Sequence, residues 1–157
     1  MTDWTTSMQR GVVSGAASSL VSTAALALLG RTETGSAYAP MNAVSHWIWG
    51  DEAAEHDGFS LKYTVTGYAI HHVSATFWSV LVEKLAGEKL DKKDLRVTLA
   101  TSAATSAFAC FVDYKMTPKR LNPGYEMRLS KKSLAGVYAA FAVGLALGAV
   151  VLRRNRR

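Results

Sequence analysis

Four long stretches of the sequence contain no aspartate, glutamate, lysine or arginine, and they constrain the fold more than any other feature. The stretches at residues 11–30, 63–82 and 133–152 are 20 residues long, and the stretch at 97–112 has 16. A helix needs about 20 apolar residues, each rising about 1.5 Å, to cross the hydrocarbon core of a bilayer. The shortest stretch reaches this length when its flanking residues are included. We therefore predict an all-α integral membrane protein, a single domain of four transmembrane helices with approximate spans at 11–30, 63–83, 95–114 and 133–152.

The charge and composition agree with a lipid environment. Hydrophobic residues make up 49% of the 157 residues, and the mean hydropathy is only +0.08 because many Ser, Thr, Gly and Ala residues occur inside the apolar stretches. The formal net charge is +6, which in a soluble protein would suggest nucleic acid as a partner. Here the charges gather in short blocks between the apolar stretches. We therefore expect the lipid bilayer as the partner, and no nucleic acid.

A shorter apolar segment lies between the first two stretches. Pro40 suits the first turn of a helix, Val44 and Trp47 continue an apolar face, and Gly50 is placed to end it. The segment at 41–49 is too short to cross a bilayer, and its tryptophans suit the level of the lipid headgroups. We predict one short interfacial or re-entrant helix here.

Small residues recur at multiples of four positions on the first and last predicted helices. Gly11 and Gly15 belong to the first, and Gly136, Gly144 and Gly148 to the last. Small side chains let helix backbones approach closely, which supports helix association where lipid offers no hydrophobic contrast. These helices carry more small-residue faces than the packing of four short helices within one chain requires. The pattern therefore favours a homo-oligomer or a place in a larger membrane complex.

The distribution of lysine and arginine indicates the orientation in the membrane. Ten of these residues fall on the side that holds both ends of the chain and the loop at 84–96, and eight fall on the other side. Positive residues are enriched in cytoplasmic loops, and the C-terminal arginines add to that side. We predict that both termini are cytoplasmic.

Two adjacent histidines, His71 and His72, lie in the middle of the second stretch. An ionisable residue at that depth is costly, and such residues usually face a protein interior, a cavity or a ligand. Histidine also titrates near neutral pH, which suits proton coupling. We therefore predict an intramembrane site that binds or passes a small polar species or protons. Its candidate residues are His71, His72, Tyr68, Ser106 and Asp113, with His46 as a further companion.

Other functions of the histidines stay open at this point. Adjacent helical residues are about 100° apart, so His71 and His72 do not readily hold one metal ion together. His46, on the short helix, could supply a second ligand with either of them, which would suit haem b or a transition metal. Alternatively, the imidazoles only form hydrogen bonds between helices, and the protein is a structural or assembly subunit. An enzyme is the least favoured class, because the sequence shows no nucleotide loop, nucleophile elbow or paired zinc motif.

A basic, turn-rich segment at 115–132 follows Asp113. Arg120 and Arg128 in this segment are candidates to bind an anion or a lipid headgroup, because guanidinium groups bind phosphate with two parallel hydrogen bonds. The alternative is a network of salt bridges at the membrane surface. The acidic segment with Glu52 and His56 is interpreted as a solvated loop.

The order of these parts resembles a known family. A helix is followed by a short aromatic segment, a histidine-bearing helix that ends in Val82-Glu83, and then Met116-Thr117-Pro118 before a polar loop and the last helix. This order, over roughly residues 60–150, resembles the YagU-like bacterial inner-membrane proteins. The resemblance implies a multi-pass protein of the bacterial inner (plasma) membrane and implies no particular activity.

Overall fold

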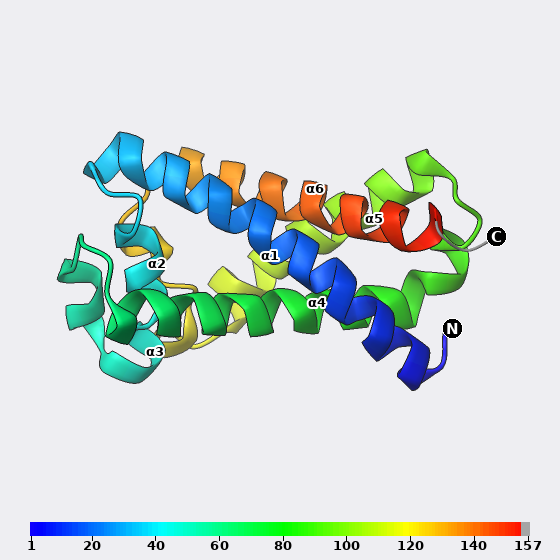
Figure 1. Cartoon of the computed structure of the whole chain (residues 1–157), viewed down its shortest axis with the longest axis horizontal. Helices are drawn as coiled ribbons and strands as arrows, with labels where there is room; N and C mark the ends of the chain where they lie inside the picture. The colour runs from blue at the N-terminus through cyan, green and yellow to red at the C-terminus, as the bar shows by residue number, and fades with distance from the viewer. Residues whose placement is uncertain (155–157) are drawn as a thin grey trace.

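The computed structural model describes residues 1–154, which are almost entirely helical and contain no strand. Four long helices run up and down in alternation: α1 (Trp4–Thr34), α4 (Thr66–Leu90), α5 (Leu95–Phe111) and α6 (Lys131–Arg154). Figure 1 shows that both termini lie at one end of the bundle and the short helices at the other. The all-helical fold is therefore confirmed, and each charge-free stretch lies in one of the four helices or in the helical turn that adjoins it.

The helix boundaries follow local capping signals. Asp94 is the N-cap of α5, because its side chain accepts hydrogen bonds from the backbone N–H of Arg96 at 2.8 Å and of Val97 at 3.3 Å. π-helical turns adjoin two of the helices, η2 (Leu61–Val65) before α4 and η3 (Val112–Met116) after α5. These turns extend both helices by one turn toward the same end of the bundle.

The N-terminus of α6 is capped from two sides. The Ser130 hydroxyl accepts a hydrogen bond from the Ser133 N–H at 3.3 Å. In addition, the carboxylate of Glu33, at the end of α1, accepts hydrogen bonds from the Ser130 N–H and hydroxyl, both at 2.7 Å, and from the Ser133 hydroxyl at 2.5 Å. The end of α1 is thereby fixed to the start of α6.

The predicted short helix is divided in two. α2 (Ala39–Val44) and α3 (His46–Trp49) are separated at Ser45 and followed by the 3-10 turn η1 (Asp51–Glu55). Gly50 ends α3 with a φ of 78°, as predicted. The residues of α2 are all buried, because α2 lies against the ends of α1 and α4. The remaining short elements, η4 (Lys119–Leu121) and η5 (Tyr125–Met127), follow α5.

The first helix is the centre of the bundle. Gly11 and Gly15 of α1 approach the backbone of α4, where an added Cβ would stand 2.7 Å from Val80 Cα and 2.6 Å from Thr76 Cα. On another face of α1, Ser18 lies equally close to Gly144 of α6. The glycines that suggested an oligomer therefore make contacts inside the chain, and the homo-oligomer stays a prediction.

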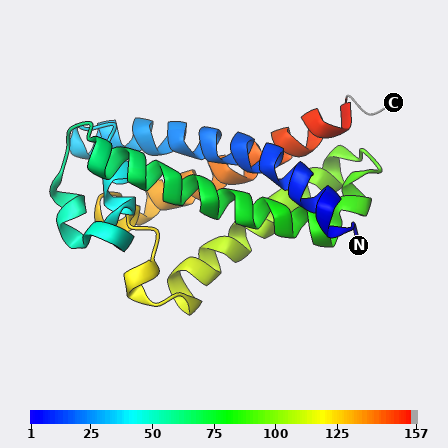
Figure 2. The ribbon, with the colours of Figure 1, turned by 60° about the horizontal axis from the view of Figure 1, so that its bottom comes forward.

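The third long helix diverges from its neighbour in sequence. α5 packs along α6, but Figure 2 shows it leaving the bundle away from α4 as it runs toward the end with the short helices. The two helices meet at their shared loop and are bridged by an edge-on contact between Trp78 and Phe108, with ring centroids 5.8 Å apart. The divergence leaves a space between α4 and α5 beyond this contact.

The bundle buries many polar side chains and exposes many apolar ones. Large apolar side chains on the outside include Val73, Phe77 and Leu85 of α4, which are 67%, 56% and 65% exposed. A water-soluble helix buries its apolar face instead. Small polar residues lie between the helices beside an apolar core that includes Leu26, Val137 and Leu145. The buried serines include Ser7, Ser14, Ser18, Ser19, Ser22, Ser79, Ser102 and Ser106.

Three helical segments are long and apolar enough to cross a membrane: Trp4–Thr34, Leu95–Met116 and Lys131–Arg154. The second predicted span, in α4, falls outside this group. Its sequence contains two histidines and several small polar residues, which lower its hydropathy although its outer face is apolar.

A cluster of four charged side chains, here called the terminal ion network, lies at the end of the bundle that holds the termini. Arg153 of α6 contacts both oxygens of Glu83 of α4, at 3.0 and 2.8 Å, and its Nε donates to Asp91 at 3.0 Å. Arg10 of α1 donates to Asp91 at 3.1 Å and lies 3.7 Å from Glu83. The network therefore joins α1, α4 and α6.

The sequence does not predict that these charged side chains are buried. In the sequence, Arg10 and Glu83 directly flank charge-free stretches, and Arg153 is the first of the C-terminal arginines. In the structure Glu83 is only 1% exposed and Arg153 only 4%, because each neutralises the other between the helices. Pairing of this kind lets α4 continue past Glu83 to Leu90. The last predicted tail residues, Arg156 and Arg157, lie outside the described residues.

Candidate functional site

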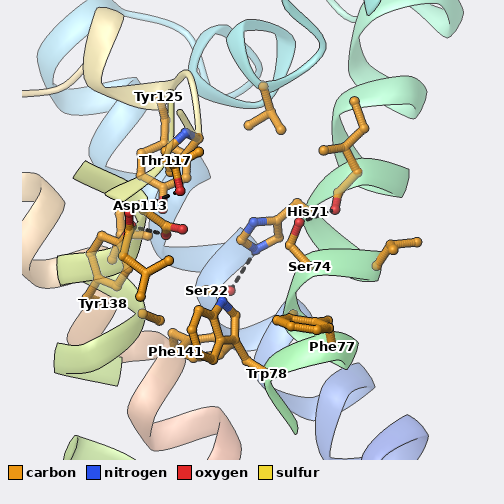
Figure 3. A pocket seen from close by; sticks show the side chains of 18 of the residues that line it. Ser22, His71, Ser74, Phe77, Trp78, Asp113, Thr117, Tyr125, Tyr138 and Phe141 are labelled. Carbon is orange, nitrogen blue, oxygen red and sulfur yellow. Dashed lines mark hydrogen bonds between the residues drawn. The ribbon is translucent and has the colours of Figure 1, made fainter. Parts of the chain in front are cut away.

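The space between α4, α5 and α6 forms a cavity of about 420 Å³, here called the central cavity. Its size falls in the range typical of small-molecule sites, about 300–1,000 Å³. The α2–α3 segment and the loop after α5 cover one end of it. Figure 3 shows that aromatic rings from several elements surround it. Its apolar lining includes Trp47, Phe77, Trp78, Val112, Val137 and Phe141.

His71 enters the central cavity from α4. Its Nε2 lies 2.8 Å from the hydroxyl of Ser22 on α1. If the single hydroxyl proton of Ser22 goes to the carbonyl oxygen of Ser18, 2.7 Å away, the Nε2–H tautomer of His71 donates to Ser22. The other ring nitrogen, Nδ1, then carries a lone pair, and it has no hydrogen bond to any of residues 1–154. His71 thus presents an acceptor to the cavity.

Asp113 lies on the opposite wall, in the π-helical turn Val112–Met116. Its Oδ2 accepts a hydrogen bond of 2.6 Å from the Tyr138 hydroxyl. Among residues 1–154, the half-buried Asp113 forms no ion pair, whereas the fully buried Glu83 is paired with arginine. Figure 3 shows the His71 ring extending from α4 toward the wall that carries Asp113. The cavity therefore contains a carboxylate without a cationic partner, facing an imidazole.

Only part of the predicted site lines this cavity. His71 and Asp113 do, but His72, Tyr68 and Ser106 do not. The ring of His72 points away from the cavity toward Tyr68, with centroids 5.7 Å apart, and its Nδ1 is buried without a hydrogen-bond partner. Ser106 donates to the backbone oxygen of Tyr138 at 2.6 Å, in the contact between α5 and α6. The rotation of about 100° between adjacent helical residues is what separates the two histidines.

Tyr68 lines a second cavity, of about 450 Å³, on the other side of α4. This cavity lies between α1 and α4 and is bounded by Tyr38 and Phe59, whose rings pack edge to face at 5.7 Å. It contains no charged side chain. The predicted site residues are therefore divided between the two sides of α4.

His46 does not join the other histidines in one site. Its Nε2 lies 2.9 Å from the Asn122 carbonyl oxygen, and its Nδ1 lies 3.8 Å from the Asp51 carboxylate. His46 does not line the central cavity that His71 enters. Among residues 1–154, no group of three or more His, Cys, Asp or Glu side chains is placed to hold a metal ion. The geometry therefore does not favour a haem or a metal held by His46 and His71.

The two arginines proposed for anion binding hold loops together. Arg128 pairs with Asp57 and donates to the Ala54 carbonyl oxygen. Arg120 donates to the carbonyl oxygen of Trp47 at 3.2 Å. Because the two guanidinium groups have separate partners, the structure does not bring them together at one site, and anion binding stays a prediction.

The acidic segment is more ordered than a solvated loop. Glu52 accepts hydrogen bonds from Lys62 at 3.1 Å and from the Tyr63 hydroxyl at 2.9 Å, which lower the pKa of Glu52 below its usual value. The His56 ring stacks on Tyr63 with centroids 4.2 Å apart. These contacts fix the segment to the start of α4. They hold Glu52 and His56 with other partners and do not arrange the two side chains around one metal site.

Sequence reasoning missed several residues of the central cavity, above all Ser22, Trp78 and Tyr138. Serine, tryptophan and tyrosine are common in membrane helices and give no signal on their own. A helical projection places Trp78 near His71 on α4, about two turns away, which is the only signal that could have linked them. The pairing of Tyr138 with Asp113 depends on how α5 crosses α6, which the sequence does not reveal.

No family model, curated protein or solved structure matches this chain. The resemblance to the YagU-like proteins therefore rests on the residues that carry it. The function has to be argued from the geometry of the central cavity and from the surface of the bundle.

Proposed function

We propose that this is an integral membrane protein of four spanning helices that binds a small amphipathic molecule in the central cavity. The membrane part is supported by the apolar exterior and the three segments long and apolar enough to span. α4 is the fourth span in this proposal. It has 25 residues, runs alongside the other three in Figure 1, and exposes Val73, Phe77 and Leu85 on its outer face.

The proposed setting is the bacterial inner membrane, with both termini in the cytoplasm. In this arrangement the ends of the chain and the loop after α4 share one side, and the segments that follow α1 and α5 share the other. The excess of lysine and arginine on the terminal side supports this orientation.

Cysteine labelling of intact cells tests the four spans. After Cys110→Ser removes the single native cysteine, a membrane-impermeant maleimide should label Glu55→Cys and Lys119→Cys but leave Thr5→Cys and Lys92→Cys unlabelled until the cells are opened. All four positions are exposed, so access depends on the membrane. Labelling of both Glu55→Cys and Lys92→Cys in intact cells would mean that α4 does not cross the bilayer.

The binding part depends on one observation, which is that His71 and the unpaired Asp113 face each other in a cavity otherwise lined by aromatic and aliphatic side chains. Binding sites for small molecules typically combine an apolar wall with a few well-placed polar groups. An apolar wall of this extent favours a molecule with a ring or chain over a small polar species or a proton alone. Val73 and Phe77 line the cavity and are 67% and 56% exposed, so the cavity opens to the outside of the bundle.

Naphthylmethanol is a suitable probe, since it joins one apolar ring system to one hydroxyl. Equilibrium dialysis against protein in a neutral detergent should show saturable binding to the native protein. Ser74→Phe, which places a ring in the cavity, should abolish the saturable component. Ala69→Phe, at an exposed position of the same helix outside the cavity lining, should leave the saturable component unchanged. This variant is the control for partition of the probe into the detergent micelle. Equal binding by both variants would contradict the proposal.

The two histidines provide a matched pair for locating the site. His71→Ala removes a polar group of the cavity wall and should weaken naphthylmethanol binding about threefold to tenfold. This is the loss of affinity that follows from losing one hydrogen bond. His72→Ala removes the same side chain from the neighbouring position, outside the cavity, and should change binding less than twofold. The dissociation constants of the two variants are compared in the same detergent. A larger effect at His72 would place the site on the other side of α4.

A further inference from the structure

The polar groups of the central cavity are arranged mainly as hydrogen-bond acceptors. The hydroxyls of Ser74 and Thr117 donate to the carbonyl oxygens of Ile70 and Val112, at 2.9 and 3.0 Å. Ser22 and Tyr138 likewise donate within the protein, to Ser18 and Asp113. These four hydroxyl protons are therefore not available to a ligand, and the oxygens present lone pairs.

The two strongest acceptors are on facing walls. Nδ1 of His71 carries a lone pair, because its ring donates to Ser22 through Nε2. Asp113 has spare acceptor capacity after its bond with Tyr138, since a carboxylate offers about four lone-pair positions. A ligand that satisfies both walls must donate several hydrogen bonds and should also carry a positive charge to neutralise Asp113.

We infer that the ligand of the central cavity is an organic ammonium ion attached to a ring or short apolar chain, with Asp113 as its counterion and His71 as a hydrogen-bond acceptor. This inference rests on the proposed binding function and names the charge class of the ligand. An ammonium group has three N–H donors and no acceptor, which complements the acceptors of the wall. A half-buried carboxylate among apolar walls is costly unless such a partner neutralises it.

The aromatic rings of the cavity support the same charge. The faces of tryptophan, tyrosine and phenylalanine attract cations, and the attraction is larger in a site without water. Trp78, Phe141 and Tyr138 lie on the cavity wall near His71 and Asp113 (Figure 3). Burial raises the pKa of Tyr125, which also lines the cavity, so its phenol remains neutral and does not compete as a second counterion.

The other charged groups near the cavity agree with this assignment. Glu126 adds a second negative charge close to Asp113, where it also accepts a hydrogen bond from the Gly124 N–H at 2.8 Å. Arg120 is an exposed side chain that donates to the backbone of Trp47. No lysine or arginine among residues 1–154 lines the central cavity, so no fixed cation there opposes a positively charged ligand.

Three probes with the same ring separate charge from shape. Naphthylmethylamine is a cation at neutral pH, naphthylmethanol is neutral and naphthoate is an anion. Equilibrium dialysis of the native protein in a neutral detergent should give an affinity for the amine about tenfold or more above that for the alcohol, as charge-assisted hydrogen bonds are the stronger ones. Naphthoate should bind more weakly than the alcohol.

The variant Asp113→Asn keeps the shape of the side chain and removes its charge. It should lower the affinity for the amine about tenfold and change the affinity for the alcohol less than twofold. Glu126→Gln, with its side chain outside the cavity lining, is the matched control and should reduce amine binding much less. Equal affinity of the native protein for all three probes would overturn the cation assignment while leaving the cavity function intact. Absence of saturable binding by any of them would overturn the proposed function itself.

Discussion

Replacing Glu83 with leucine should destabilise the folded protein by about 3–5 kcal/mol, the usual cost of removing one member of a buried ion pair. Glu83 is 1% exposed and accepts two hydrogen bonds from Arg153. Its loss leaves the guanidinium groups of Arg153 and Arg10 with only Asp91, whose side chain is 42% exposed. The midpoint of a sodium dodecyl sulfate titration, followed by circular dichroism, measures the effect.

The double variant Glu83→Leu with Arg153→Leu tests the reason for this cost. It removes both members of the pair and leaves Arg10 with Asp91, at 3.1 Å. Because no unpaired charge remains buried, most of the stability should return, as happens when a buried ion pair is replaced by apolar residues. If the double variant is less stable than Glu83→Leu alone, the cost of Glu83→Leu does not come from leaving Arg153 as an unpaired buried charge.

Replacing Gly144 with alanine should destabilise the bundle by about 1–3 kcal/mol, because the added methyl group overpacks the contact between α1 and α6. A Cβ at Gly144 would stand 2.4 Å from Ser18 Cα, a distance that real Cβ atoms do not reach. The obstacle is backbone, which cannot move aside as a side chain can. The same detergent titration measures the change.

Gly136 provides the matched control on the same helix. A Cβ at Gly136 would meet only Leu29 Cδ1, at 3.5 Å, which is an ordinary contact. Gly136→Ala should therefore be neutral or slightly stabilising, by up to about 1 kcal/mol through its better helix propensity. Equal destabilisation at the two positions would show that α6 does not approach α1 as closely as the structure has it.

Features that depend on one segment could be predicted from the sequence. The four charge-free stretches predict the long helices, Asp94 and Ser130 mark helix starts, and Gly50 marks an end. Each of these signals depends on periodicity or on a cap within a few residues. The close contacts of Gly11, Gly15, Gly144 and Gly148 were also indicated by their spacing, although the partners were not.

Features that depend on two segments could not be predicted. Arg10, Glu83 and Arg153 resemble flanking charges in the sequence, and only the crossing of three helices makes them one buried network. The central cavity likewise results from the angle between α5 and α4, which no residue spacing encodes. Helical geometry did predict that His71 and His72 point in different directions, but it could not show that Asp113 lies opposite only the first.

The central position of α1 has a consequence for how the protein is made. Among the four long helices this one is synthesised first, yet the groups that cover its serine face belong to α4 and α6. In the proposed membrane setting, Ser14 and Ser18 face lipid until α6 is synthesised, unless an insertion factor shields them. We expect chains truncated before residue 131 to be recognised by membrane quality-control proteases, so that assembly is completed only when the final helix arrives.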